Sequence, residues 1–199
     1  SHLFGTNGQK WLSQYGWERP PKARGEIEFT LNPWTSRETN WKRDIEPTMS
    51  LSGSFEAQTS SFRGVPASSA RSHLYFTNQI WRLPDLFVTR PEGTVALDYW
   101  CETKSQNYWW KIESVVDPFC LKPLFGDGAQ RAFDYFQFTT PPRVEGTLWG
   151  RWQAPDRTGF SSTVAVTNFI CRGETGGEFR AGLEYTNQFL QIRDVDFRR

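Results

Sequence analysis

Histidine, cysteine and methionine are scarce in this chain, and their scarcity excludes several kinds of site. The 199 residues include two His, three Cys and one Met. Because His2 and His73 cannot form a usual metal site without carboxylate help, we predict no metal. Cys101, Cys120 and Cys171 are odd in number and show no C-x-x-C spacing. We interpret them as buried free thiols, with one disulfide pair as the alternative.

Motifs for nucleophilic and cofactor chemistry are also missing. The chain has no Gly-rich phosphate loop, no serine elbow and no dinucleotide fingerprint. Glu26 with Glu28, and Asp194 with Asp196, are carboxylate pairs of a kind that glycosidases use. We interpret the first pair as facing solvent, opposite an apolar set, and the second as part of a terminal ion-pair cluster with arginines. Whether the chain is an enzyme stays open, with the balance against it.

Net charge and long apolar runs are lacking as well. The formal charge is +1, so there is no long-range field to attract nucleic acid, and we expect no nucleic-acid partner. No apolar run is long enough to span a bilayer, and no signal-peptide core follows the first residues. The chain starts at Ser1 rather than Met. That start fits a processed organellar or exported protein, and equally a trimmed chain.

Aromatic residues and arginine are what the chain has in excess. Ten Trp and sixteen Phe must either fill a wide core or cover a partner. The basic residues are 17 Arg against 6 Lys. Because Arg suits partly buried contacts better than Lys, we expect protein subunits of a larger complex as partners. A GC-rich genome explains the arginine surplus equally well.

Alternation of apolar and polar residues predicts an all-β chain. It is clearest in Arg143–Phe197, which contains four segments with a period of two, as expected for half-buried strands. Further strands are predicted at Gly25–Leu31, Met49–Ala57, His73–Trp81, Leu86–Arg90, Thr94–Cys101, Tyr108–Val116 and Ala132–Thr139. Trp34–Pro47 and Gln58–Ser72 are predicted to be loops, the second long and exposed.

We therefore expect residues 1–199 to form a single domain, with residues 1–24 as an N-terminal extension that carries a short helix. The antiparallel meander should close into a barrel of roughly 8–10 strands, because closure removes unpaired edges. A two-sheet jelly-roll sandwich is the alternative.

Two sets of residues mark candidate sites in such a barrel. The interior set is predicted to bind a ligand, and it consists of Trp110, Phe133, Trp152, Phe179 and Tyr185. The second set lies on strand faces opposite the best apolar residues and is predicted to bind a partner. It consists of Trp149, Arg151, Phe169 and Arg180.

Residues 8–14 carry a resemblance to a known family. Gly8-Gln-Lys-Trp11 resembles the Gly-x-Trp opening of the calycin (lipocalin-type) barrels, with one residue too many. Lys10-Trp-Leu-Ser-Gln14 resembles the start of the lipocalin-like phycobiliprotein chromophore lyases. The resemblance covers these few residues and the order of elements, with no match through the closing strands. It implies a cavity for a tetrapyrrole or a lipid.

Three functions follow from these observations. The first is a non-catalytic β-barrel that binds a hydrophobic ligand or serves as an accessory subunit of an assembly. The second is a jelly-roll protein that binds or cleaves glycans. The third, implied by the resemblance, is a tetrapyrrole chromophore lyase or carrier.

Overall fold

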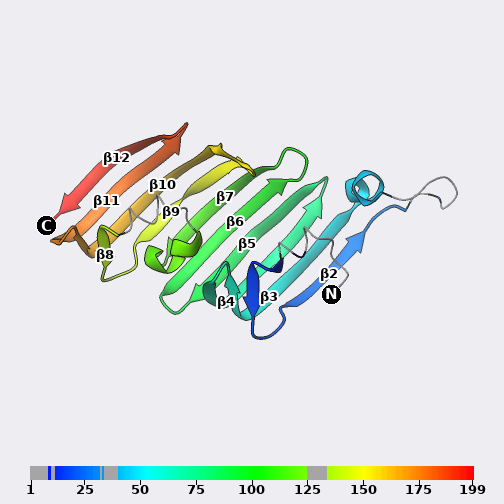
Figure 1. Cartoon of the computed structure of the whole chain (residues 1–199), viewed down its shortest axis with the longest axis horizontal. Helices are drawn as coiled ribbons and strands as arrows, with labels where there is room; N and C mark the ends of the chain where they lie inside the picture. The colour runs from blue at the N-terminus through cyan, green and yellow to red at the C-terminus, as the bar shows by residue number, and fades with distance from the viewer. Residues whose placement is uncertain (1–8, 10–11, 32, 34–39, 125–133) are drawn as a thin grey trace.

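The computed structural model describes residues 9, 12–31, 33, 40–124 and 134–199, and these residues form one antiparallel β-sheet (Figure 1). The predicted all-β, antiparallel class is confirmed. The strands are β1 (Tyr15–Trp17), β2 (Lys22–Glu28), β3 (Ser50–Phe62), β4 (Val65–Thr77), β5 (Ile80–Arg90), β6 (Gly93–Glu102), β7 (Asn107–Val115), β8 (Phe136–Phe138), β9 (Arg143–Arg151), β10 (Ala154–Cys171), β11 (Glu174–Thr186) and β12 (Phe189–Arg198). Helical turns are short, namely η1 (Trp41–Ile45), η2 (Glu46–Thr48) and η3 (Pro118–Leu124).

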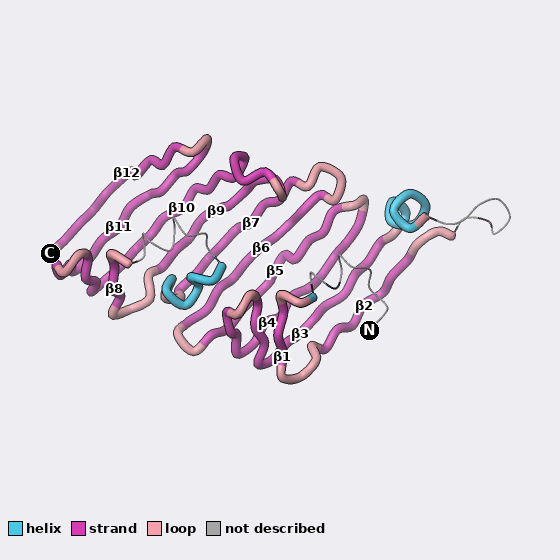
Figure 2. Tube along the Cα trace, in the orientation of Figure 1, coloured by secondary structure: helices cyan, strands magenta, loops and turns pink. Residues whose placement is uncertain are grey.

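The sheet is open. Its order is β1-β3-β4-β5-β6-β7-β9-β10-β11-β12, with β2 beside β3 and β8 beside β10. Within the described residues the two end strands do not pair with each other, so the predicted barrel is not formed, and there is no second sheet for a sandwich (Figure 1). Closure requires tilted strands with a staggered register. Here the strands lie side by side in one extended sheet (Figure 2).

Two-residue turns with left-handed backbone join several of the strands. Both turn residues have positive φ in the hairpins at Arg63-Gly64, Asn78-Gln79, Arg172-Gly173 and Asn187-Gln188. This is the type I′ pattern, whose twist matches that of the flanking strands. The first of these turns corrects the prediction for Gln58–Ser72, which is not a loop but the hairpin of β3 and β4. Its Ser-rich composition was misleading, because the serines lie within paired strands and only Ser68 is exposed.

The N-terminal prediction is only partly covered by the described residues. The amide of Ser13 donates a hydrogen bond to the carbonyl of Gln9 at 2.9 Å, which makes one helical turn. Gly8 and Trp11, on which the expected helix and the family resemblance depend, lie outside the described residues. Of the predicted strand Ala132–Thr139 only β8 is described as a strand, and Phe133 also lies outside the described residues.

The sheet has one apolar and one polar side. Since paired residues point to the same side and successive residues to opposite sides, the register assigns each strand residue to a face. We call the side that carries Tyr99, Trp110 and Leu148 the apolar face, and the side that carries Trp100, Trp109 and Trp149 the polar face. Most of the buried residues, including Phe76, Cys101, Tyr108, Val166 and Ala181, belong to the apolar face.

Much of this surface is accessible to solvent. The chain exposes 14205 Å². A compact monomer of 23.1 kDa is expected to expose about 9,700 Å². The difference follows from a single sheet that is not folded over on itself.

Candidate functional site: the two faces of the sheet

The apolar face is built from rows of side chains that run across the strands. One row joins seven strands from β5 to β12 and consists of Leu83, Tyr99, Trp110, Leu148, Phe160, Tyr185 and Leu190, each directly opposite the next. With strands about 4.8 Å apart, this row is roughly 29 Å long. A neighbouring row contains Leu86, Leu97, Ile112, Gly146, Ser162, Leu183 and Ile192. The rows make a broad, almost uncharged surface.

Aromatic contacts join neighbouring strands on this face. The ring centroids of Tyr99 and Trp110 lie 4.1 Å apart, and those of Phe76 and Trp81 lie 4.6 Å apart. Phe160 and Tyr185 are stacked at 5.5 Å. Burial raises the pKa of the Tyr99 hydroxyl, because the phenolate is poorly solvated among these side chains. The face is therefore apolar enough to disfavour charge.

The structure brings four of the five predicted interior residues to this face. Trp110 and Tyr185 lie in the first row, and Phe179 lies on the same face opposite Val166. Trp152 lies in the turn after β9, and its ring is 4.5 Å from the ring of Tyr108, which belongs to the apolar face. The residues line an open surface and not a barrel interior. The fifth, Phe133, is outside the described residues.

The predicted partner-binding set is divided between the two faces. Trp149, Arg151 and Arg180 lie on the polar face, as the alternation indicated. Phe169 does not: it is 6% exposed, and its ring contacts those of Phe179 and Phe197 on the apolar face, each at 6.3 Å. The cause is the left-handed backbone of Asn168 (φ 51), which interrupts the alternation of β10 just before Phe169.

A row of tryptophans crosses the polar face. Trp100, Trp109 and Trp149 are directly opposite one another on β6, β7 and β9, and Arg82 on β5 extends the row. The ring of Trp149 lies over Gly159, where an added Cβ would be 2.7 Å from the indole. Glycine at that position lets the indole lie flat against β10. All three indoles are half-buried.

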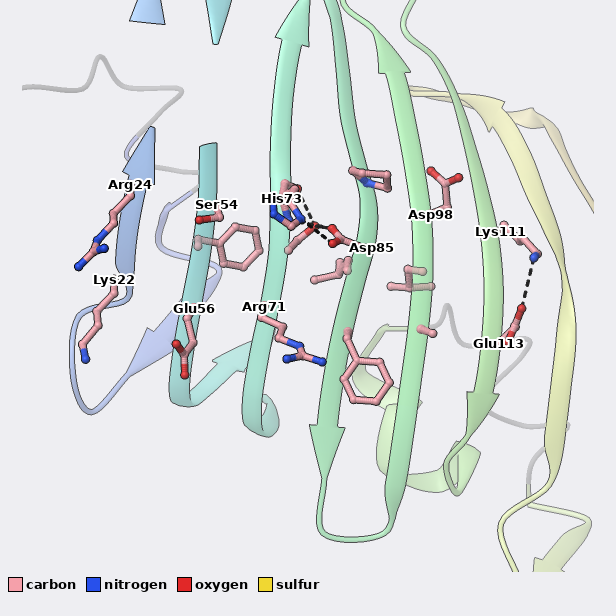
Figure 3. A pocket seen from close by; sticks show the side chains of 17 residues that line it. Lys22, Arg24, Ser54, Glu56, Arg71, His73, Asp85, Asp98, Lys111 and Glu113 are labelled. Carbon is pink, nitrogen blue, oxygen red and sulfur yellow. Dashed lines mark hydrogen bonds and ion pairs between the residues drawn. The ribbon is translucent and has the colours of Figure 1, made fainter. Parts of the chain in front are cut away.

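Beside this row the polar face is hollowed. The hollow has a volume of about 790 Å³ and lies over β2 to β7, where Ser54 and Ala96 contribute only small side chains (Figure 3). Its rim is charged, with Lys22, Arg24, Glu56, Arg71, Asp98, Lys111 and Glu113 around it (Figure 3). A second hollow of about 540 Å³ lies next to it and is lined by Glu26, Glu28, Tyr75 and Arg82 among others.

His73 and Asp85 form a close pair in the larger hollow, of residue types that some catalytic sites use. The His73 Nδ1 and the Asp85 Oδ2 are 2.6 Å apart, and the His73 amide donates to Asp85 Oδ1 at 2.8 Å (Figure 3). Burial pushes the pKa of Asp85 up, but the hydrogen bonds from the His73 ring, the His73 amide and Ser72 outweigh burial, and the net shift is downward. The carboxylate is thereby held ionised.

A bulge in β5 places Asp85 there. The register of β5 shifts by one residue against both β4 and β6 between Leu83 and Leu86, where Pro84 has no amide to donate. At the bulge the Asp85 carboxylate, and not a backbone carbonyl of β5, accepts the hydrogen bond from the His73 amide. The predicted strands missed this bulge, because one ended before Pro84 and the next began at Leu86, whereas β5 continues through the proline. A proline inside a strand is a signal from which the bulge could have been predicted.

The described residues place no hydroxyl or thiol as a nucleophile against the His73 ring. Ser72 donates its hydroxyl to the His73 carbonyl at 2.6 Å and to Asp85 Oδ1 at 3.2 Å. The three thiols are unpaired; Cys101 is buried, Cys120 exposed and Cys171 half-buried. Within the described part of the chain no three His, Cys, Asp or Glu residues come together as metal ligands do. We therefore interpret the pair as a structural support of the bulge.

Comparison with protein-family models, with curated proteins and with solved structures found no match for this chain. Among the described residues, no helix has both the length and the apolar character needed to cross a membrane. The function must therefore be argued from the two faces themselves.

Proposed function

We propose that this chain is a non-catalytic binding protein whose apolar face holds the hydrocarbon part of a lipid-like ligand. The observation that carries the proposal is the unbroken row of apolar side chains from Leu83 to Leu190 across seven strands. Monomers rarely expose contiguous apolar patches larger than a few hundred Å², and larger ones mark interaction sites.

The dimensions of the face suit acyl chains. Adjacent rows are two residues apart along the strands, or roughly 7 Å, and each row is roughly 29 Å long. A bilayer core of about 30 Å accommodates two leaflets of acyl chains, so one chain needs about half that length. An acyl chain that lies along or across the rows would remove its own apolar surface and that of the half-buried aromatic side chains from water. Each Å² of apolar surface removed contributes about 25 cal/mol of binding free energy.

The chemistry of the face also supports an apolar ligand over a polar one. The two central rows contain no charged side chain, and their polar members are the Tyr99 and Tyr185 hydroxyls, the Trp110 indole and Ser162. A flat tetrapyrrole offers similar apolar area but brings propionate charges, for which these rows offer no cation. An acyl chain needs none.

Fluorescence quenching tests the proposal directly. Trp81 and Trp110 lie on the apolar face, and Trp100, Trp109 and Trp149 lie on the polar face. We expect a fatty acid brominated in mid-chain to quench wild-type fluorescence at micromolar concentration. The Trp110→Phe variant should lose a larger part of the quenchable signal than the matched variant Trp109→Phe. Equal loss in both variants, or no saturable quenching, would contradict the proposal.

A second pair of variants tests binding without relying on a fluorophore. Leu97 and Ala96 are neighbours on β6 that point to the apolar and polar faces respectively. Leu97→Asp should reduce the lipid recovered by organic extraction and mass spectrometry of the purified protein, whereas Ala96→Asp should not. A visible absorbance band in the purified protein would instead indicate a tetrapyrrole. A bound protein subunit with no lipid would indicate the accessory-subunit role.

The tryptophan row favours a second candidate function, glycan binding on the polar face. Flat indoles flanked by charged side chains are suited to stacking against sugar rings, and Trp100, Trp109 and Trp149 form such a row beside Arg82. Titration with an oligosaccharide panel should then shift wild-type tryptophan emission, and Trp109→Phe should reduce the shift while Trp110→Phe should not. Emission that no sugar moves excludes this candidate.

A further inference from the structure

The edge strand β2 has a self-complementary charge pattern. Its sequence from Lys22 to Glu28 is Lys-Ala-Arg-Gly-Glu-Ile-Glu, and all seven residues are exposed. Lys22, Arg24, Glu26 and Glu28 point to the polar face, because their partners on β3 are Glu56, Ser54, Ser52 and Ser50. Two positive charges are thus followed by two negative charges, with Gly25 at the centre.

These four charges have no partner within the described part of the chain. No ion pair or side-chain hydrogen bond joins any of them to another described residue, although Glu56 lies directly opposite Lys22. The outer backbone groups of β2 are likewise unpaired, since β3 is its only strand neighbour in the described sheet. An exposed edge of this kind is a template for a further strand.

We propose that β2 pairs with β2 of a second copy of this chain. The two copies are related by a two-fold axis that is perpendicular to the sheet and passes midway between the two Gly25 residues. In this antiparallel arrangement Lys22 lies opposite Glu28 of the second copy and Arg24 lies opposite Glu26. The symmetry repeats both pairs, so every basic residue faces an acidic one. Parallel pairing in register would place like charges opposite each other, which is destabilising.

The other face of β2 and the central glycine fit the same arrangement. Ala23 faces Ile27 of the second copy on the apolar side, and Ile27 is 57% exposed in the single chain. Gly25 faces Gly25 of the second copy at the axis, between the two sets of charge pairs. The interface is isologous, which is the commonest symmetry among soluble oligomers. It joins the two apolar faces on the same side of one longer sheet.

The opposite edge of the sheet does not have these properties. β12 carries Gln191, Arg193, Asp196 and Arg198 on its polar side, an order that is not symmetric about any centre. A bulge with left-handed backbone at Asp194 (φ 50) also interrupts its register. Such bulges protect edges from pairing. β2, and not β12, is therefore the edge suited to pairing with a second copy.

Charge-reversal variants test the proposal in the full chain. The basic variant, Glu26→Arg with Glu28→Lys, and the acidic variant, Lys22→Glu with Arg24→Glu, each place like charges across the two-fold axis. Sedimentation velocity at about 0.15 M salt should show dimers of wild type and a dissociation constant at least about tenfold higher for each variant. An equimolar mixture of the two variants should recover a heterodimer, because opposite charges again face each other.

Control variants make each outcome decisive. Arg193→Glu with Asp196→Arg changes charge on the β12 edge and should leave the dimer unchanged, and circular dichroism verifies that every variant keeps its β-structure. Raising the salt concentration should weaken the wild-type dimer, whereas a dimer formed through the apolar faces would persist. A monomeric wild type at high concentration, or a dimer that both reversals leave intact, overturns the proposal. Lipid binding by the apolar face is independent of either result.

Discussion

Phe76 offers the sharpest test of which face of the sheet stabilises the fold. Its side chain is 1% exposed on the apolar face, opposite Leu51 on β3 and Trp81 on β5. Its ring lies 4.6 Å from that of Trp81. A buried phenylalanine removes about 150 Å² from water, which at about 25 cal/mol per Å² corresponds to about 4 kcal/mol. Phe76→Ala should therefore lower the free energy of unfolding by about 3–5 kcal/mol.

The neighbouring Tyr75 is the matched control. It is of similar size, lies on the same strand and points to the polar face, where it is 42% exposed. Tyr75→Ala should cost about 1 kcal/mol, since it loses mainly the strand preference of an aromatic residue. The assay is urea denaturation followed by circular dichroism, with the slope of each transition compared. Equal losses for the two variants would refute the assignment of the apolar face as the core.

Three further predictions follow from single residues. Asp85 has a pKa below its ordinary value of 3.8, so its contribution to stability is present above that value and is lost as the pH falls through the lowered pKa. Asp85→Asn should thus lose less stability than wild type on acidification from about pH 5 to pH 3, measured by urea denaturation at both pH values. Arg90 is 7% exposed and donates hydrogen bonds to Glu92 and to the carbonyl of Pro66. Arg90→Met should cost about 3–5 kcal/mol of unfolding free energy, against little for the exposed Arg82→Met, and a cost near zero would contradict the pairing. Gly173 has φ 86 with nothing within 4 Å of an added Cβ, so Gly173→Ala should cost about 1–2 kcal/mol in thermal unfolding through backbone conformation alone. An unchanged melting temperature in that variant would mean that the turn adopts another conformation.

Most of the strands follow from the sequence, because a period of two depends only on neighbouring residues. The predicted strand His73–Trp81 is wrong, since it spans the turn Asn78-Gln79 between β4 and β5. Arg143–Phe197 forms the four strands β9, β10, β11 and β12, and the short β8 before this range pairs with the end of β10.

The faces also follow, and Trp110 and Trp149 are on opposite sides as the alternation indicated. Phe169 is the exception, because the left-handed residue Asn168 before it reverses the alternation. Asparagine adopts this conformation more readily than most residues, a signal that the prediction from alternation did not use.

Closure could not be predicted in the same way. Whether a meander becomes a barrel depends on tilt and stagger accumulated over all strands, which no local pattern records. The pairing of His73 with Asp85 could not be predicted from the sequence either. It depends on the extra residue in β5 and on the register of β5 with β4 and β6. The self-complementary order of charges in β2, in contrast, is legible in the sequence once β2 is known to be an edge.

The nearly sequential strand order determines which parts of the sheet should unfold first. Most strands pair with the strands before and after them along the chain, and the non-sequential pairs are β1 with β3, β7 with β9 and β8 with β10. Stability in such an array is close to a sum of nearest-neighbour terms, as in a repeat protein. Amide hydrogen exchange should therefore be fastest at the two ends and slowest between β5 and β10. β12, with all ten residues exposed, should detach first and leave the remaining sheet folded.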